Sequence, residues 1–284
     1  MSSSEAPYRP AVVTVLRPEP LDGRVGISRA RGANFVVEWL DFAEGASHQL
    51  DSGAEALLLL DGNSGRIASG ADTAKAPARS VSVLPAGPVT LTFDSAGSAV
   101  IIRTDVLDAG SLNAVDYATP HSRVAPLGRP YRRIGGPRIQ VIAVDDIKAP
   151  AAKPRLRIVQ SDTMSISWIE YSGLRDRSKL TPHNHDDFEQ GSLAITGSFV
   201  HHIRAPWGPN AAFWIDDAHL EAPPRSLTMI PPPLIHTTEG RGEDRHVLID
   251  VFAPVRRDFF DAGWISNGAF YALPEGVASG EAAR

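Results

Sequence analysis

The sequence predicts an all-β protein built from two similar barrels in tandem. Short apolar runs such as residues 56–60 (ALLLL), 89–93 (VTLTF) and 247–252 (VLIDVF) are separated by turn residues, drawn from 24 glycines and 23 prolines. Runs of this length between turn residues are typical of strands in a sandwich or barrel. The 284 residues, 43% of them apolar, are enough for two domains of about 130 to 150 residues, each with its own core.

An internal repeat divides the chain into two copies of one domain. Short matching segments recur in the same order, and length differences fall only between them. The matching pairs are 37–42 with 166–171, His48 with His183, Glu55 with Gln190, Gly62 with Gly197, and 83–90 with 229–236. We expect an N-terminal domain over residues 1–104, a linker with connecting strands over 105–154, and a C-terminal domain over 155–284. The segment 149–154 (APAAKP) has a linker composition.

Charge and composition exclude several classes of function. A net charge of −5 and a pI near 6.0 give no basic face for nucleic acid or an anionic membrane. With no cysteine, any metal must be held by nitrogen and oxygen ligands. The first ten residues lack the basic start and apolar run of a signal peptide, and no apolar stretch is long enough to span a membrane. We expect a cytoplasmic protein that acts on a small molecule.

The sharpest local feature is His183-Asn184-His185 in the second copy. On a strand, residues i and i+2 point to the same face, so both imidazoles could bind one ion at about 2.0–2.2 Å. A third histidine, His236, follows the proline run 231–233. An isolated His-x-His at a loop edge is more often an exposed polar pair, and the third histidine favours a metal site.

This ordering resembles the two signature motifs of the cupin superfamily. The first reads His-x-His, a few residues, Glu, six residues, Gly, and the second reads Pro-x-Gly-x-x-His. The resemblance covers both halves of the chain and implies two antiparallel jelly-roll barrels, a bicupin, with a metal in the mouth of one barrel. Two positions depart from the pattern without touching a ligand: Pro233 stands in place of glycine, and Gly240 in place of asparagine.

The fourth ligand is either Gln190 or Glu189. Six residues separate Gln190 from Gly197, which is the family spacing for the acidic ligand, and Glu55 has the same spacing to Gly62 in the first copy. We therefore prefer Gln190 and keep Glu189 as the alternative, since neighbouring strand residues face opposite ways. Three imidazoles and a neutral amide would leave the ion its full +2 charge, which favours an anionic or enolisable substrate oxygen.

The first copy has His48, Leu50, Glu55 and Thr90 at the corresponding positions. Leucine cannot bind a metal and threonine is a poor substitute for imidazole, so two remaining ligands would not hold a divalent ion. We expect one divalent metal per chain, with the N-terminal barrel serving packing or dimerisation. By analogy with such folds, a homodimer is the expected assembly.

Three further residues are candidates for catalysis. Strand alternation places either His201 or His202 inside the barrel, where it could transfer a proton or orient a ligand; a solvent-exposed pair is the alternative. Arg204 shares the face of His202 and could bind a substrate carboxylate or form an outward salt bridge.

The resemblance implies a metal-dependent enzyme. An Fe(II) dioxygenase comes first, because four protein ligands leave two positions for dioxygen and a small chelating substrate such as a diketone, catechol or keto or hydroxy acid. One alternative is an oxygen-independent isomerase or lyase that uses Mn, Ni or Zn as a Lewis acid. The other is a ligand-binding bicupin without enzymatic activity, since the fold alone does not decide function.

Overall fold

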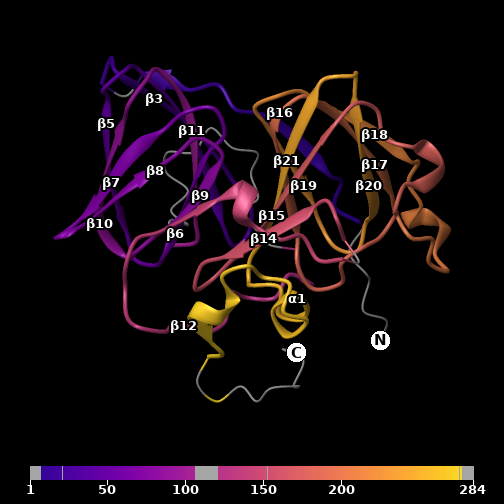
Figure 1. Cartoon of the computed structure of the whole chain (residues 1–284). Helices are drawn as coiled ribbons and strands as arrows, with labels where there is room; N and C mark the ends of the chain where they lie inside the picture. Colours follow the sequence, from indigo (N-terminus) through magenta and orange to yellow (C-terminus); the bar gives the residue numbers. More distant parts are fainter. Residues whose placement is uncertain (1–7, 21, 106–120, 152, 275, 277–284) are drawn as a thin grey trace.

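Two β-barrels lie side by side in the structure (Figure 1). The computed structural model describes residues 8–20, 22–105, 121–151, 153–274 and 276. Nearly all of its regular structure is antiparallel strand, with one short α-helix, α1 (Arg257–Asp261). The predicted all-β fold with two barrels is therefore confirmed. No helix in the described ranges has the length and apolar character needed to cross a membrane.

The first barrel consists of a seven-stranded and a four-stranded sheet. The larger sheet has the order β13 (Gln140–Ala143), β9 (Ser80–Leu84), β6 (Ala56–Leu60), β11 (Gly97–Arg103), β4 (Val36–Phe42), β3 (Val25–Arg31), β2 (Glu19–Pro20). The smaller sheet has the order β5 (Ser47–Ser52), β10 (Gly87–Phe93), β7 (Gly65–Ser69), β8 (Asp72–Ala76).

The second barrel consists of a six-stranded and a three-stranded sheet. The larger sheet has the order β1 (Val12–Val15), β19 (Ser226–Ile230), β16 (Gln190–Thr196), β21 (Arg245–Phe252), β15 (Ser165–Ser172), β14 (Leu156–Gln160). The smaller sheet has the order β18 (Ala218–Ala222), β17 (Ser198–Arg204), β20 (Ile235–Arg241). The remaining elements are the pair β12 (Arg132–Arg133) and β22 (Tyr271–Ala272), and the 3-10 turns η2 (Val144–Asp146), η3 (Arg177–Lys179), η4 (Ala211–Phe213) and η5 (Gly268–Phe270).

The repeat seen in the sequence corresponds to equivalent strands. Residues 37–42 lie on β4, between β11 and β3, and residues 166–171 lie on β15, between β21 and β14. The expected turn at Gly197 joins β16 to β17 with a φ of +80°, and a Cβ there would come within 2.9 Å of the Arg245 carbonyl. β1, from the N-terminal part of the chain, joins the second barrel by pairing with β19, and β13, from the linker, joins the first barrel by pairing with β9.

The continuous apolar run on β6 is explained by burial on both faces of its sheet. Leu58 and Leu60 belong to the core inside the first barrel. Leu57 and Leu59 belong to a separate core that also contains Trp168 of β15 in the second barrel. Because successive strand residues face opposite sides, a strand covered on both sides contains no polar alternation. The larger sheets of the two barrels thus pack against each other.

The interiors of the two barrels differ. The first is filled by apolar side chains such as Leu50, Leu91 and Phe93. In the second barrel, the inward positions of β16 and β21 include Gln190 and Asp250, which line a cavity of about 630 Å³. The second barrel therefore has a hollow, partly polar interior suited to a ligand.

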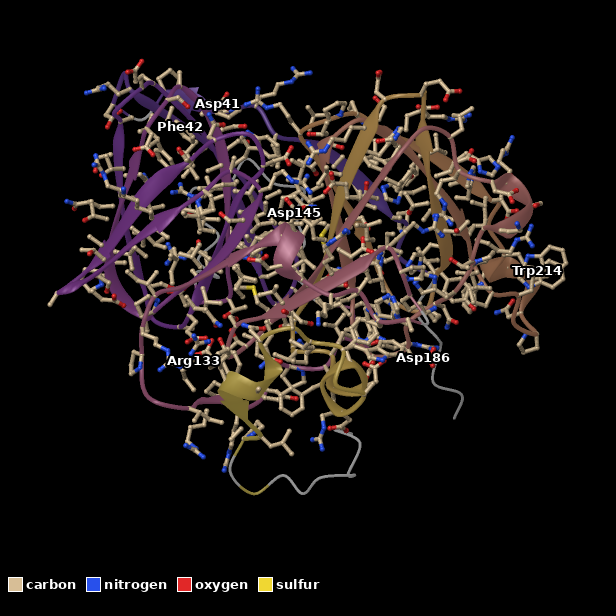
Figure 2. The ribbon with its side chains drawn as sticks, in the orientation of Figure 1. Asp41, Phe42, Arg133, Asp145, Asp186 and Trp214 are labelled. Carbon is tan, nitrogen blue, oxygen red and sulfur yellow. The ribbon has the colours of Figure 1, made fainter. Side chains whose placement is uncertain are left out.

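An ionic network also joins the barrels. Arg79 of the first barrel binds Glu170 of the second at 2.7 Å, and Arg245 of the second binds Asp61 of the first at 2.6 Å. Arg79 also binds Asp145, which lies between the two barrels (Figure 2). The two bridging arginines hold the pKa of Glu170 down to about 2, against the effect of its burial.

Candidate metal centre

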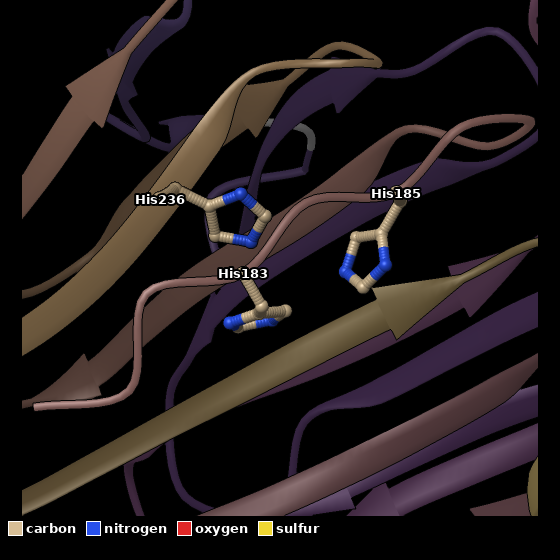
Figure 3. A group of neighbouring side chains, drawn as sticks. All are labelled: His183, His185 and His236. Atoms are coloured by element: carbon tan, nitrogen blue, oxygen red, sulfur yellow. The ribbon is translucent and has the colours of Figure 1, made fainter. Parts of the chain in front are cut away.

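Three histidine side chains converge at the mouth of the second barrel. One ring nitrogen from each of His183, His185 and His236 lies within 4.8 Å of the other two. Figure 3 shows the rings of His183 and His185 coming from one segment and the ring of His236 coming from β20. Nitrogens bound to one ion are about 3.0 Å apart at right angles and at most about 4.2 Å apart, so separations of up to 4.8 Å would shorten when an ion binds.

The His-x-His segment is not a regular strand, which differs from the expectation. His183 forms a single antiparallel bridge with His236, with N···O distances of 3.0 and 2.7 Å, and the chain then runs as a loop to Gln190. The backbone bridge nevertheless places the first and third histidines directly opposite each other.

Backbone carbonyls orient two of the rings. The Nδ1–H of His183 donates to the Thr181 carbonyl, and the Nδ1–H of His236 donates to the Leu234 carbonyl, both at 3.0 Å. In each ring the Nε2 atom is thereby left with a lone pair for a metal. Burial lowers the pKa of His185 to about 3 and that of His236 to about 4, so both rings are neutral at neutral pH.

Gln190 points its carbonyl oxygen at the histidines. Its Oε1 lies 3.0 Å from His185 Nε2 and 3.2 Å from His236 Nε2. The orientation of the amide follows from the opposite side: its NH₂ donates to Ser192 Oγ at 3.0 Å, and that hydroxyl donates to Asp250 Oδ1 at 2.5 Å. Because a carboxylate only accepts, the donor end of the amide faces Asp250 and the oxygen faces the rings.

This donor set fits a divalent metal ion. His236 Nε2 and Gln190 Oε1 are both acceptors, yet they lie 3.2 Å apart with no proton available between them. Two ligand atoms at about 2.1 Å from one ion and at right angles to each other would be about 3.0 Å apart. A cation at this position would turn a repulsive contact into a favourable one.

Glu189, the alternative ligand, points away from the histidines. Its carboxylate accepts the backbone N–H groups of Ala33 and Asn34 in the first barrel. Burial raises the pKa of Glu189 to about 7, against the lowering effect of these two hydrogen bonds. Of the two adjacent residues, only Gln190 faces the triad, as expected for neighbours on a strand.

His201, rather than His202, lies inside the second barrel. His201 is fully buried, and its Nδ1 lies 2.8 Å from the hydroxyl of Thr238, a residue of the cavity wall. Burial lowers the pKa of His201 to about 3. His202 faces outward, 2.7 Å from His219 and 3.3 Å from Glu239.

Arg204 does not line the cavity. It lies exposed on the outer face of β17 and forms a salt bridge with Asp217. Of the two arrangements that the sequence left open for this residue, the structure contains the outward salt bridge.

The cavity contains functional candidates that the sequence reading did not find. Asp250 supports Gln190 through Ser192, and burial raises its pKa to about 6. A single acid within the apolar run 247–252 was the available signal. Arg256 lies 4.0 Å from the ring centroid of Phe259 and forms a salt bridge with Asp258. Arg256 also lines the cavity, which sequence spacing does not reveal because it does not show which loops fold over the barrel.

Within the described part of the first barrel, no comparable donor set surrounds His48. Its antiparallel partner is Leu91, a buried residue, whereas Thr90 is half-exposed and faces the other side of β10. Thr90 was thus the wrong counterpart of His236, by one position of strand register. Glu55 accepts a hydrogen bond of 2.6 Å from Tyr271, and Arg133 lies 3.9 Å away.

No family model and no curated protein sequence matches the chain. Solved structures with the same fold include AerE from Microcystis aeruginosa, with 10% identity and a TM-score of 0.57 over 85% of this chain and 98% of that chain. The formate complex of Lactobacillus farciminis oxalate decarboxylase has 12% identity and a TM-score of 0.58 over 92% of each chain. A 7S globulin from Momordica charantia has 11% identity and a TM-score of 0.54 over 85% of this chain and 83% of that chain. Similarity at these identities shows a shared fold alone.

Proposed function

We propose that this chain, which has the bicupin fold, is a metal-dependent enzyme whose centre is formed by His183, His185, His236 and Gln190. The observation that carries the proposal is the approach of His236 Nε2 to Gln190 Oε1, two acceptors held 3.2 Å apart in a cavity. Maintaining such a contact is costly without a cation, and the Ser192–Asp250 pair prevents the amide from turning away.

Within this class we propose an Fe(II) dioxygenase. A ferrous ion would supply a centre at which a chelating substrate oxygen and dioxygen are activated together. The protein provides four neutral ligands, which leave the charge of the ion uncompensated and so favour an enolate, catecholate or carboxylate oxygen. Its cavity walls include Phe252, Phe259 and Trp264, which would limit access of water to the reacting groups.

His201 is assigned a positioning role in this scheme. It contacts Thr238, whose side chain lines the cavity, and does not line the cavity itself. A pKa of about 3 makes its ring a weak base at neutral pH, so it would not take a proton from the substrate. Its function would be to fix the hydroxyl of Thr238 beside the bound substrate.

An oxygen-independent reaction is the second candidate. The nitrogen and oxygen donor set also suits Mn²⁺, Ni²⁺ or Zn²⁺ acting as a Lewis acid. One of the similar structures is named as a decarboxylase, which supports keeping a reaction other than oxygenation as an alternative. Turnover under strictly anaerobic conditions distinguishes the two candidates.

The test of the first candidate is oxygen uptake by the Fe(II)-loaded chain over a panel of diketones, catechols and keto acids. We expect uptake with at least one substrate class, and loss of uptake in Gln190→Ala. The matched control, Gln49→Ala, changes an exposed glutamine of the first barrel. Background uptake over the whole panel by fully loaded protein would exclude a dioxygenase acting on these substrates.

A further inference from the structure

The cavity beside the histidine triad has an excess of basic side chains. Its walls include Lys153, Arg155, Arg175 and Arg256, and their acidic counterparts are Asp250 and Asp258. Asp258 is already paired with Arg256, at 2.5 Å. Asp250 is occupied by the Ser192 hydroxyl. A divalent ion would increase this positive charge further.

Among the described residues, three of the four cations of the cavity wall form no ion pair with a carboxylate within 4.0 Å, namely Lys153, Arg155 and Arg175, whereas Arg256 pairs with Asp258. Arg175 is half-buried, and it donates from Nη1 to the carbonyl of Thr238 at 3.0 Å. This hydrogen bond anchors its guanidinium to the wall and leaves the other N–H groups for a ligand.

Arg155 and Arg175 also lie close enough to repel each other. Burial and the charge of Arg155 both lower the pKa of Arg175. Tyr171 is another residue of the cavity wall. Burial raises the pKa of its hydroxyl, and the charges of Arg175 and Arg155 both act to lower it. Arg175 is half-buried and Arg155 is exposed at the rim of the cavity, and an anion bound between them would offset their repulsion.

The position of Arg175 sets the size of the ligand. Its anchor, Thr238, lies two residues along β20 from His236, a displacement of about 7 Å at the usual rise of a strand. Apolar side chains line the same cavity, namely Leu156, Ile169, Leu248, Phe252, Phe259 and Trp264. A ligand that reaches from the triad to Arg175 would therefore contact hydrocarbon along its length.

We infer that the substrate of this centre is an amphipathic carboxylate. One end carries the oxygen that binds the metal, the body is aliphatic or aromatic, and a remote carboxylate is bound by Arg155 and Arg175. The inference rests on the proposed function for the metal-binding end of the substrate. The carboxylate end rests on the unpaired cations of the wall.

The test compares carboxylic acids with their methyl esters. Dihydrocaffeate joins a chelating catechol to a remote carboxylate through a short hydrocarbon chain, and its methyl ester replaces the negative oxygen with a neutral methoxy group. Levulinate and its ester form a second pair with a ketone oxygen. Calorimetric titration of the zinc-loaded full chain, which is inert to redox turnover, should show at least one acid binding about tenfold or more tightly than its ester.

Substitutions locate the effect. Arg175→Met and Arg155→Met should each weaken binding of the acid by roughly 10- to 100-fold and leave binding of the ester unchanged. Arg177→Met is the matched control, because Arg177 is exposed and pairs with Glu239 outside the cavity wall. The inference is overturned if neither acid binds more tightly than its ester, or if Arg175→Met weakens acid and ester equally.

Metal analysis distinguishes a failure of the carboxylate site from a failure of the proposed metal centre. If the metal centre is wrong, the chain fails to retain zinc, and the acid-over-ester preference is then measured on the metal-free chain. A preference that persists and depends on Arg175 supports the carboxylate site alone. Retained zinc with no preference overturns the carboxylate site alone.

Discussion

His236 Nε2 and Gln190 Oε1 face each other at 3.2 Å, although neither atom has a proton to donate. The arrangement is maintained from both sides. The Leu234 carbonyl accepts a hydrogen bond from the Nδ1–H of His236, and the Ser192 oxygen accepts one from the NH₂ of Gln190. Such a pair of converging lone pairs is what a metal ion requires of its ligands.

Ser192→Ala should weaken metal binding without removing a ligand. Loss of the Ser192 hydroxyl frees the amide of Gln190 to turn its NH₂ towards His236. Losing an outer hydrogen bond of this kind typically costs about 10- to 100-fold in metal affinity. Competition with a chelating dye measures the change, and Ser82→Ala, a buried serine of the first barrel, is the matched control. Equal affinities of Ser192→Ala and wild type would contradict the role given to this hydroxyl.

Glu170→Gln should destabilise the protein at neutral pH. Glu170 accepts from Arg79 at 2.7 Å and from Arg245 at 2.8 Å, and its replacement should cost about 1–3 kcal/mol in free energy of unfolding. The folded-state pKa of about 2 lies below the ordinary value of 4.5, so this contribution is complete above pH 4.5 and is lost as the pH falls towards 2.

Urea unfolding of wild type and Glu170→Gln at several pH values tests the predicted pH dependence of this stabilisation. The stability gap should narrow steadily below pH 4.5, whereas the exposed control Glu221→Gln should show little gap at any pH. A gap that stays constant down to pH 2 would show that the ionic network does not hold Glu170 in its charged form.

Tyr271→Phe should destabilise the fold and leave metal content unchanged. The hydroxyl of Tyr271 is buried and donates to Glu55 at 2.6 Å in the first barrel. Its removal leaves a buried acceptor with one partner fewer, at a cost of about 1–3 kcal/mol. Thermal unfolding and metal analysis of the same samples give both quantities. A drop in the metal bound by folded Tyr271→Phe protein would contradict the separation of this hydrogen bond from the metal centre.

Much of the fold followed from sequence periodicity, because short apolar runs and the internal repeat report directly on strands. The histidine triad was also accessible, since His183, His185 and His236 recur in a recognisable order. The sequence could not decide between Gln190 and Glu189 as the fourth ligand. Adjacent strand residues face opposite sides, and the sequence does not state which side is inward. The strand register, set by pairing with β19 and β21, decides which of the two side chains faces the histidines.

The basic side chains of the cavity wall could not be predicted from the sequence for a different reason. Arg175 lies in the connection after β15 and Arg256 in the one after β21, and connections have no periodicity from which their direction can be read. The assignment of Thr90 failed through a shift of one residue. Such a shift reverses the face of every side chain on a strand, and only the pairing of His48 with Leu91 revealed it.

Metal analysis of the chain purified without added metal tests the central claim most directly, in wild type, His236→Ala and the exposed control His219→Ala. His236 lies at the point where the triad and Gln190 meet, whereas His219 lies on the outer face of the second barrel. The account predicts about one equivalent of divalent metal in wild type and His219→Ala, and nearly none in His236→Ala. Equal metal content in all three proteins would contradict it.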